Sequence, residues 1–199
     1  MSEEVEVQKA VRGRPRSRSA DARILKAALK LVEAGGFQSV TMEAIAATAD
    51  VARTTIYRRW PNKESVIMDA FLEEVGPAIA FPTLPNVRES LRRQMKLLAK
   101  AFRGKAGLLI RSLLAEAQFN SELRTAFRER WIAKRRASAI AVIKAGIASG
   151  EIPSRIDPDI LLDVLYGGLY YRLLIGTGTI SDDYVDSVWE TVVGGLGER

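Results

Sequence analysis

Apolar residues recur every three to four positions along most of the chain, which is the spacing of one face of an α-helix. The pattern predicts helices over residues 19–35, 41–49, 53–60, 62–75, 86–102, 106–118, 121–148, 157–176 and 181–194. No segment alternates apolar and polar residues in the way that predicts a strand. The expected fold class is therefore all-α.

Capping and breaking residues indicate where several of these helices begin and end. Gly35 and Gly36 stop the first helix, and Asn86 and Glu89 have the spacing of a capping box. The triplet Asp157-Pro158-Asp159 combines an N-cap carboxylate, a proline at the first helical position and a second acid near the helix dipole.

The composition removes several kinds of chemistry. The 199 residues include no cysteine and no histidine, which excludes disulfides, Cys/His zinc sites and Ser-His-Asp triads. No motif for a phosphate loop, a dinucleotide-binding fold or a metal-binding loop is complete. We therefore expect no enzyme activity, no cofactor and no metal. No stretch reaches the ~20 apolar residues of a membrane span, so we expect a cytoplasmic protein without a membrane partner.

Charge is distributed unevenly along the chain. Lys and Arg outnumber Asp and Glu by 12 to 5 over residues 9–65 and by 15 to 4 over residues 87–150. Residues 151–199 reverse this balance, with 3 basic against 9 acidic residues. The net charge of +6 favours an anionic partner. The opposite charges of the basic and acidic blocks suggest different partners for the two ends.

The segment TMEAIAATADVARTTIYRRWPNK, residues 41–63, predicts two short helices around a three-residue break, as in a helix-turn-helix. Apolar residues at 45, 46, 51, 56 and 60 would join the two helices. The side chains left to face outward are Arg53, Thr54, Thr55, Tyr57 and Arg58. Their donors and methyl groups suit the phosphates and base edges of double-stranded DNA. The spacing is equally compatible with an ordinary helical hairpin that has a solvated charged face.

The stretch ILKAALKLVEAGGFQSVTMEAIAATADVARTTIYRRWPNKESVIMDAF resembles the DNA-binding domain of the TetR family of bacterial repressors. The resemblance covers residues 19–70, and within the family it is strongest to the branch with a basic GRP arm and a YRRW recognition helix. Residues 1–18 have almost no large apolar residues and are rich in arginine, so we expect a flexible basic arm there. The resemblance implies a three-helix helix-turn-helix DNA-binding domain over 19–65 and a helical ligand-binding and dimerisation domain over 66–199.

The resemblance also implies a homodimer that binds a palindromic operator and responds to an unknown small-molecule effector. By position, the five outward side chains named above match the family's recognition-helix face, and Thr41 and Lys63 match flanking phosphate contacts. The chain departs from the family at the turn. Asp50 stands where glycine is common, and Ala52 stands where a capping serine is common.

The basic arm offers a second mode of DNA contact. The segment Arg12-Gly13-Arg14-Pro15-Arg16 resembles the core of an AT-hook. Such segments enter A·T-rich minor grooves, whose potential attracts arginine. Arg14 and Arg16 are therefore candidate contacts to an A·T-rich flank of the operator. Plain attraction to phosphates is the alternative.

The last two predicted helices favour dimerisation. The helix over 157–176 is apolar on nearly all of its surface, so we expect other helices to pack against two of its sides. The last helix has one broad apolar stripe. The family resemblance implies a four-helix dimer interface here, whereas a purely intrachain core is the alternative. The candidate interface residues are Leu161, Leu165, Gly168, Tyr184, Val188, Trp189 and Val192.

Large side chains of the C-terminal region are candidates for an effector pocket, with simple core packing as the alternative for each. They are Phe71, Met95, Phe102, Leu109, Leu113, Phe119, Trp131, Tyr166 and Tyr170. A basic block on one predicted helix would form a solvated face, attract DNA at long range or bind an anionic ligand. It comprises Arg124, Arg128, Arg130, Lys134, Arg135 and Arg136.

These features favour a DNA-binding transcriptional regulator, a repressor released from its operator by a small-molecule effector. The signal would pass through the helix that follows Asn62, which joins the two domains. The alternative is a constitutive architectural DNA-binding protein that needs no effector.

Overall fold

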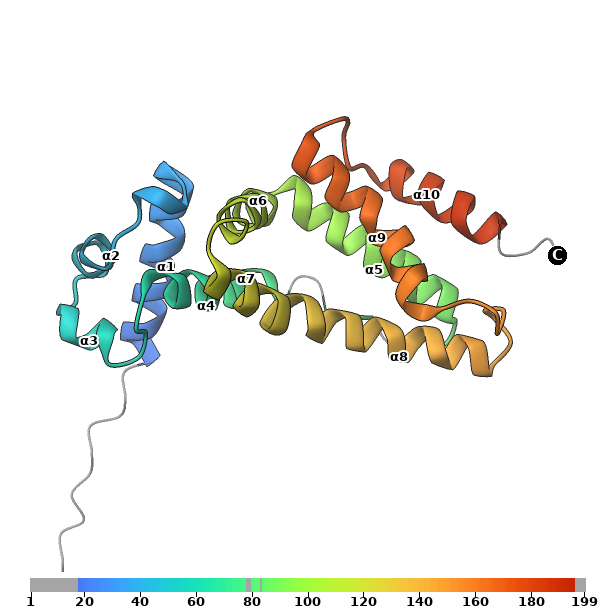
Figure 1. Ribbon diagram of the computed structural model, residues 1–199, viewed down its shortest axis with the longest axis horizontal. Helices are drawn as coiled ribbons and strands as arrows, with labels where there is room; N and C mark the ends of the chain where they lie inside the picture. Colours follow the sequence, from blue (N-terminus) through green and yellow to red (C-terminus); the bar gives the residue numbers. More distant parts are fainter. Residues whose placement is uncertain (1–17, 78–79, 83, 196–199) are drawn as a thin grey trace, which may run out of the picture.

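The computed structural model describes residues 18–77, 80–82 and 84–195, and these residues form helices and connecting turns without a strand (Figure 1). The N-terminal elements are α1 (Arg18–Gly35), η1 (Phe37–Ser39), α2 (Met42–Ala49), α3 (Arg53–Tyr57) and α4 (Lys63–Val75). The C-terminal elements are α5 (Val87–Arg103), α6 (Lys105–Ala117), α7 (Ser121–Phe127), η3 (Arg128–Ala133), α8 (Lys134–Ala148), α9 (Pro158–Ile175) and α10 (Asp182–Gly194). The all-α prediction is confirmed.

Three boundaries differ from the sequence-based expectation. Helix α1 already begins at Arg18, inside the arm predicted over residues 1–18. The remainder of that arm lies outside the described residues. Helix α3 ends at Tyr57 and not near Trp60, because the N–H groups of Arg59 and Trp60 both bond to the carbonyl of Ile56 in a turn. The predicted helix 121–148 is continuous, but its middle six residues, η3, form a π-helix.

The N-terminal helices form one end of the molecule (Figure 1). Helix α1 packs against α2 and α4, and Ile24, Ile45, Ile56 and Ile67 are completely buried there. Helix α4 also contacts α6 and α7 of the C-terminal region. The predicted division between residues 65 and 66 therefore falls within a helix that both regions share.

Helix α5 is central to the C-terminal region, since it contacts α6, α8, α9 and α10. Its buried face includes Leu91, Met95, Leu98 and Phe102, together with the polar residue Gln94. Helices α8 and α9 pack against each other beside it. No helix in residues 18–77, 80–82 and 84–195 is long and apolar enough to cross a membrane.

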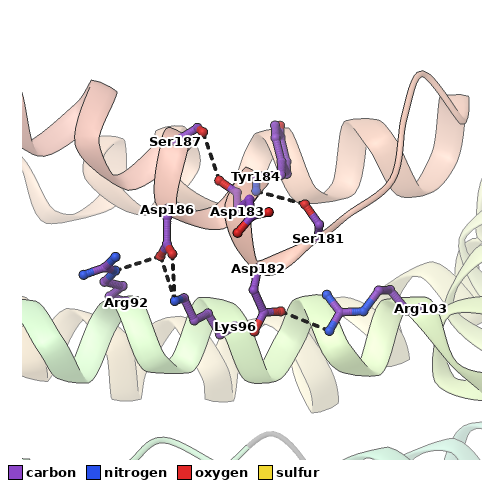
Figure 2. A network of polar contacts seen from close by, with 9 residues as sticks. All are labelled: Arg92, Lys96, Arg103, Ser181, Asp182, Asp183, Tyr184, Asp186 and Ser187. Carbon is purple, nitrogen blue, oxygen red and sulfur yellow. Dashed lines mark hydrogen bonds and ion pairs between the residues drawn. The ribbon is translucent and has the colours of Figure 1, made fainter.

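Ion pairs join the acidic C-terminal segment to the basic segment before it (Figure 2). Asp186 of α10 lies 2.8 Å from both Arg92 Nε and Lys96 Nζ of α5, and Asp182 lies 3.0 Å from Arg103. The expectation that opposite charges point to different external partners is therefore wrong for these acids. Their partners are basic residues of the same chain.

Candidate DNA-binding surface and effector cavity

The turn between α2 and α3 has the geometry of a helix-turn-helix. Asp50 closes α2 in the left-handed region, with φ 51° and ψ 59°, and is the one non-glycine residue with positive φ among those described. Aspartate tolerates this region better than most residues, so the departure from glycine does not disturb the turn. Ala52 caps α3 without a side-chain hydrogen bond.

Buried residues fix the orientation of the recognition helix α3. Ile45, Ala46, Ile56 and Trp60 are buried and Val51 is partly buried, as predicted for the joint between the helices. Because Ile56 points into the core, the neighbouring side chains of this single-turn helix point outward. The recognition helix therefore presents a surface that is set by the domain core.

The predicted recognition residues lie mostly on that outward surface. Arg53, Thr54 and Arg58 are exposed, Tyr57 is 50% exposed, and Thr55 is half-buried. Arg53 Nη1 lies 3.4 Å from Oε1 of a glutamate on α2, but both side chains are exposed. Such pairs contribute little, so DNA phosphates compete with them readily.

The predicted flanking contacts are engaged within the protein. The Thr41 hydroxyl accepts a 3.0 Å hydrogen bond from the Ala44 N–H and so caps α2. Lys63 Nζ donates to the Phe37 carbonyl at 3.3 Å and lies 5.0 Å from the centre of that ring. Both residues stand at helix N-termini, as expected, while Arg14 and Arg16 lie outside the described residues.

A cavity of about 290 Å³ lies between α5, α8 and α9, with Phe81 of the α4–α5 connection at its side. Its apolar lining consists of Phe81, Leu98, Ile132, Ala139, Leu162 and Gly167. Its polar lining consists of Gln94, Arg135, Arg136, Asp163, Tyr166 and Tyr170. A second cavity, of about 320 Å³, adjoins Phe81 and Arg135 on the side of α4 and η3.

Two of the residues predicted for an effector pocket, Tyr166 and Tyr170, line the first cavity. Trp131 borders the second. Five others belong to the packed core instead, where their rings and branched chains are enclosed by neighbouring helices: Phe71, Met95, Phe102, Leu109 and Leu113. Phe119 is 93% exposed on the connection after α6 and contacts neither cavity.

Sequence reasoning missed Gln94, the residue with the most informative geometry. It is completely buried, and its Oε1 accepts a hydrogen bond from the Tyr166 hydroxyl. Its Nε2 has no hydrogen-bond partner in the part of the chain that the structure describes. The available signal was a glutamine within the apolar stripe of α5, next to Met95.

The tyrosines of the cavity are neutral hydrogen-bonding groups. Burial raises the pKa of Tyr166 and of Tyr170, because a phenolate would lose its hydration there. The Tyr170 ring also packs edge-on against Phe102, with centroids 5.1 Å apart. The two hydroxyls therefore keep their protons at neutral pH.

The basic block divides into three groups. Arg124, Arg128 and Lys134 are exposed, consistent with a solvated face. Arg130 pairs with Asp69 of α4.

Arg135 and Arg136 reach the cavity. Arg136 lies 2.6 Å from both Asp159 and Asp163 of α9. The Arg135 guanidinium lies 4.8 Å from the Trp131 ring centre, and burial lowers its pKa. Arg135 thus brings a positive charge into a largely apolar wall.

The predicted dimer residues lie in two environments. Leu161, Leu165 and Trp189 are buried within the chain's own core, so they offer little surface to a partner. Gly168, Tyr184, Val188 and Val192 are only partly buried. The exposed apolar residues of α9 are different ones, between 48% and 63% accessible: Ile160, Val164, Tyr171, Leu174 and Ile175.

The chain is similar to known regulators over most of its length. Residues 24–69 match the family described as bacterial regulatory proteins, tetR family, and residues 82–192 match the tetracyclin repressor-like C-terminal domain. An uncharacterized HTH-type transcriptional regulator of Bacillus subtilis, YdeS, is 34% identical over 174 residues, covering 87% of this chain and 88% of YdeS.

Solved structures show the same architecture. The TetR family transcription regulator SCO0332 aligns with a TM-score of 0.75 and 29% identity, covering 90% of this chain and all of that chain. The regulator FadR from Bacillus subtilis, in complex with stearoyl-CoA, aligns with a TM-score of 0.73 and 22% identity. The alignment covers 88% of this chain and 98% of the FadR chain. This chain therefore belongs to the TetR family of DNA-binding transcriptional regulators.

Proposed function

We propose that the protein is a homodimeric repressor that binds a palindromic operator and releases it when a small molecule occupies the α5–α8–α9 cavity. The observation that carries this proposal is the position of α4. This helix starts directly after the recognition turn, and its Phe71 packs against Trp131 of η3, which continues into the cavity helix α8. A DNA-binding regulator acts where the chromosome is, so we place it in the cytoplasm.

The DNA contacts would come from the outward surface of α3. Arg53, Arg58 and Tyr57 offer charged and hydroxyl donors to phosphates and base edges in the major groove. Thr54 and Thr55 add small methyl-bearing side chains. Thr41 and Lys63 would contact phosphates on either side, and Arg14 and Arg16 would reach an A·T-rich flank.

The partner subunit would cover α9. Its exposed apolar residues, such as Val164, Tyr171 and Leu174, follow helical spacing on one face. A second copy would bury this face and place two recognition helices about one DNA turn apart, as palindromic half-sites require. Sedimentation of Leu174→Glu should show a monomer if the face is the interface.

The cavity and the recognition helix are connected by packed side chains. Trp131 of η3 packs against Phe71 of α4, with ring centres 4.6 Å apart. Arg130, the preceding residue, pairs with Asp69 on the same helix. A ligand that shifts η3 and α8 would therefore move α4 and change the separation of the two recognition helices.

Fluorescence anisotropy on the DNA upstream of the protein's own gene, against a scrambled duplex at several salt concentrations, tests this function. A specificity ratio above about 10³ would support a regulator, and candidate effectors would then be screened by DNA release. Equal binding to both duplexes with a steep salt dependence would instead indicate an architectural DNA-binding protein. If neither duplex binds, selection from random sequences would find an operator located elsewhere.

A further inference from the structure

The cavity has an apolar body and one polar corner. Leu98, Ile132 and Leu162 form part of the body. At the polar corner, the Tyr166 hydroxyl bonds to Gln94 Oε1, which leaves the Gln94 Nε2 donor buried without a partner among the described residues. A buried donor that lacks an acceptor is unfavourable, so a ligand that supplies an acceptor gains affinity by satisfying it.

Charge at the cavity favours an anionic acceptor. The carboxylate in the lining belongs to Asp163, and it is engaged by Arg136 at 2.6 Å. Arg135 adds a further positive charge to the lining. Burial lowers the pKa of this guanidinium, because its charged form loses hydration in the cavity wall. An anion beside this guanidinium would offset the loss of its hydration.

We infer that the effector is a small organic anion, with a carboxylate or similar oxyanion head and a compact apolar body. This inference rests on the proposed function, because it names the class of ligand for the same cavity. The head accepts hydrogen bonds from Arg135, from Gln94 Nε2 and from the Tyr170 hydroxyl. The apolar body lies against the wall of α5, α8 and α9.

The size of the cavity limits the body. A volume of about 290 Å³ is at the lower end of small-molecule sites, which span about 300–1,000 Å³. It suits a single ring with a short chain, or a medium-length aliphatic acid. A long acyl chain joined to a nucleotide would exceed it.

Matched ligands that differ only in the head group provide the first test. Binding to the full-length protein is measured by isothermal titration calorimetry with 4-phenylbutyrate, 4-phenylbutyramide and 4-phenylbutylamine, and with the corresponding octanoic series. We expect at least one acid to bind tenfold or more tightly than its amide, and the amines to bind weakest. Equal binding of acid and amide, or failure of both acids to bind, would overturn the inference.

Variants assign the preference to the cavity. Arg135→Gln should remove the preference for the acid over the amide, whereas Arg135→Lys should retain part of it. Gln94→Leu should weaken the acid several-fold, because it removes the Nε2 donor. Arg111→Gln is the matched control, because Arg111 is exposed on α6 and borders neither cavity. An acid preference that survives in Arg135→Gln would contradict the assignment.

Operator binding separates this inference from the proposed function. Without ligand, Arg135→Gln should bind operator DNA as tightly as the unchanged protein. If Arg135→Gln does not fold, Arg135→Lys and the head-group series on the unchanged protein decide the question. Absence of a head-group preference in the unchanged protein, with intact operator binding, would overturn only the inference. Absence of specific DNA binding by the unchanged protein would overturn the proposed function, while the anion measurements would still stand.

Discussion

Trp60 and Asp69 are joined by a 2.8 Å hydrogen bond from the indole Nε1 to Oδ2, which fixes the turn after the recognition helix onto α4. The other carboxylate oxygen of Asp69 pairs with Arg130 of the π-helical segment. One side chain therefore contacts both the DNA-binding end and the helix that borders the cavities. This arrangement makes Asp69 the most direct test of how the two regions are coupled.

Replacement of Asp69 by Asn keeps an acceptor for Trp60 but removes the charge opposite Arg130. We expect a loss of about 1 kcal/mol in the free energy of unfolding, because the pair is only partly buried. Arg130→Gln should cost a similar amount alone and little in addition to Asp69→Asn. Urea unfolding of both single variants and the double variant measures this. Strictly additive losses would mean that the two groups contribute independently.

Replacement of Arg58 or Tyr57 by Ala should weaken operator binding by about 1–3 kcal/mol, or roughly 5- to 150-fold, if each reads a base edge. Because Tyr57 is half-exposed and Arg58 is exposed, the melting temperature should change little. Arg111→Ala is the control for a lost charge far from α3. Anisotropy against operator and scrambled DNA measures both affinity and specificity. Wild-type affinity in both variants would remove α3 from the interface.

Replacement of Ala52 by Ser should stabilise the protein by about 1 kcal/mol. Ala52 has the extended backbone of an N-cap residue, with φ −67° and ψ 142°, but supplies no side-chain acceptor to α3. Ala47→Ser, at an exposed interior position of α2, should instead cost a few tenths of a kcal/mol because serine is a weaker helix former. Thermal unfolding of the two variants without DNA compares them. An unchanged or lower stability of Ala52→Ser would show that the cap cannot form.

The pH dependence of stability should contain a contribution from Asp186. Hydrogen bonds from Arg92, and then from Lys96, lower the pKa of this carboxyl below its ordinary value of 3.8. Its stabilisation is therefore fully present above pH 3.8 and is lost as the pH falls through the lowered value. Asp186→Asn should be less stable than the unchanged protein at pH 6, and the difference should shrink in acid.

Urea unfolding of the two proteins between pH 6 and pH 3 measures this difference. Asp183→Asn is the control, because Asp183 is exposed on the same helix and forms no ion pair in the described structure. A difference that stays constant with pH would exclude the ion pairs as its source.

Gly107 and Gly167 differ in the space that their surroundings leave for a Cβ atom, so alanine substitutions at the two positions can be compared. A Cβ at Gly107 would lie 1.9 Å from the carbonyl oxygen of Phe102, whereas a Cβ at Gly167 would meet nothing within 4 Å. Gly107→Ala should therefore destabilise the protein by more than about 2 kcal/mol. Gly167→Ala should stabilise it by up to about 1 kcal/mol. Chemical unfolding measures both, and similar effects would mean that the α5–α6 junction relaxes freely.

The sequence predicted the elements that depend on local residues. Helical periodicity and caps such as Asn86 and Asp157 gave the helices, and the buried joint of Ile45 and Ile56 followed from the same spacing. The lining of the cavity was harder to predict from the sequence, because it depends on which large side chains the packed helices enclose. Phe71 and Phe102 are large and apolar, as pocket-lining residues often are, yet tertiary contacts place them in the core.

Two further features depend on tertiary structure. The apolar residues of α9 divide between the chain's own core, as for Leu165, and the exposed face, as for Val164. Periodicity could not separate these sides, since the helix is apolar nearly all round. The π-helical segment was not predicted either, because apolar periodicity distinguishes a helix from a strand but not one type of helix from another.

That segment makes the length of the helix tolerant of change. A π-turn holds one residue more than the α-turn it replaces, so removing one residue between 128 and 133 would let the helix return to ordinary α geometry. Side chains after the deletion would keep nearly the same direction around the axis, and Arg135 would stay at the cavity wall. Removing a residue within α8 would instead rotate the side chains that follow by about 100°. The π-helical segment is therefore the place where this long helix changes length at the least cost to its contacts.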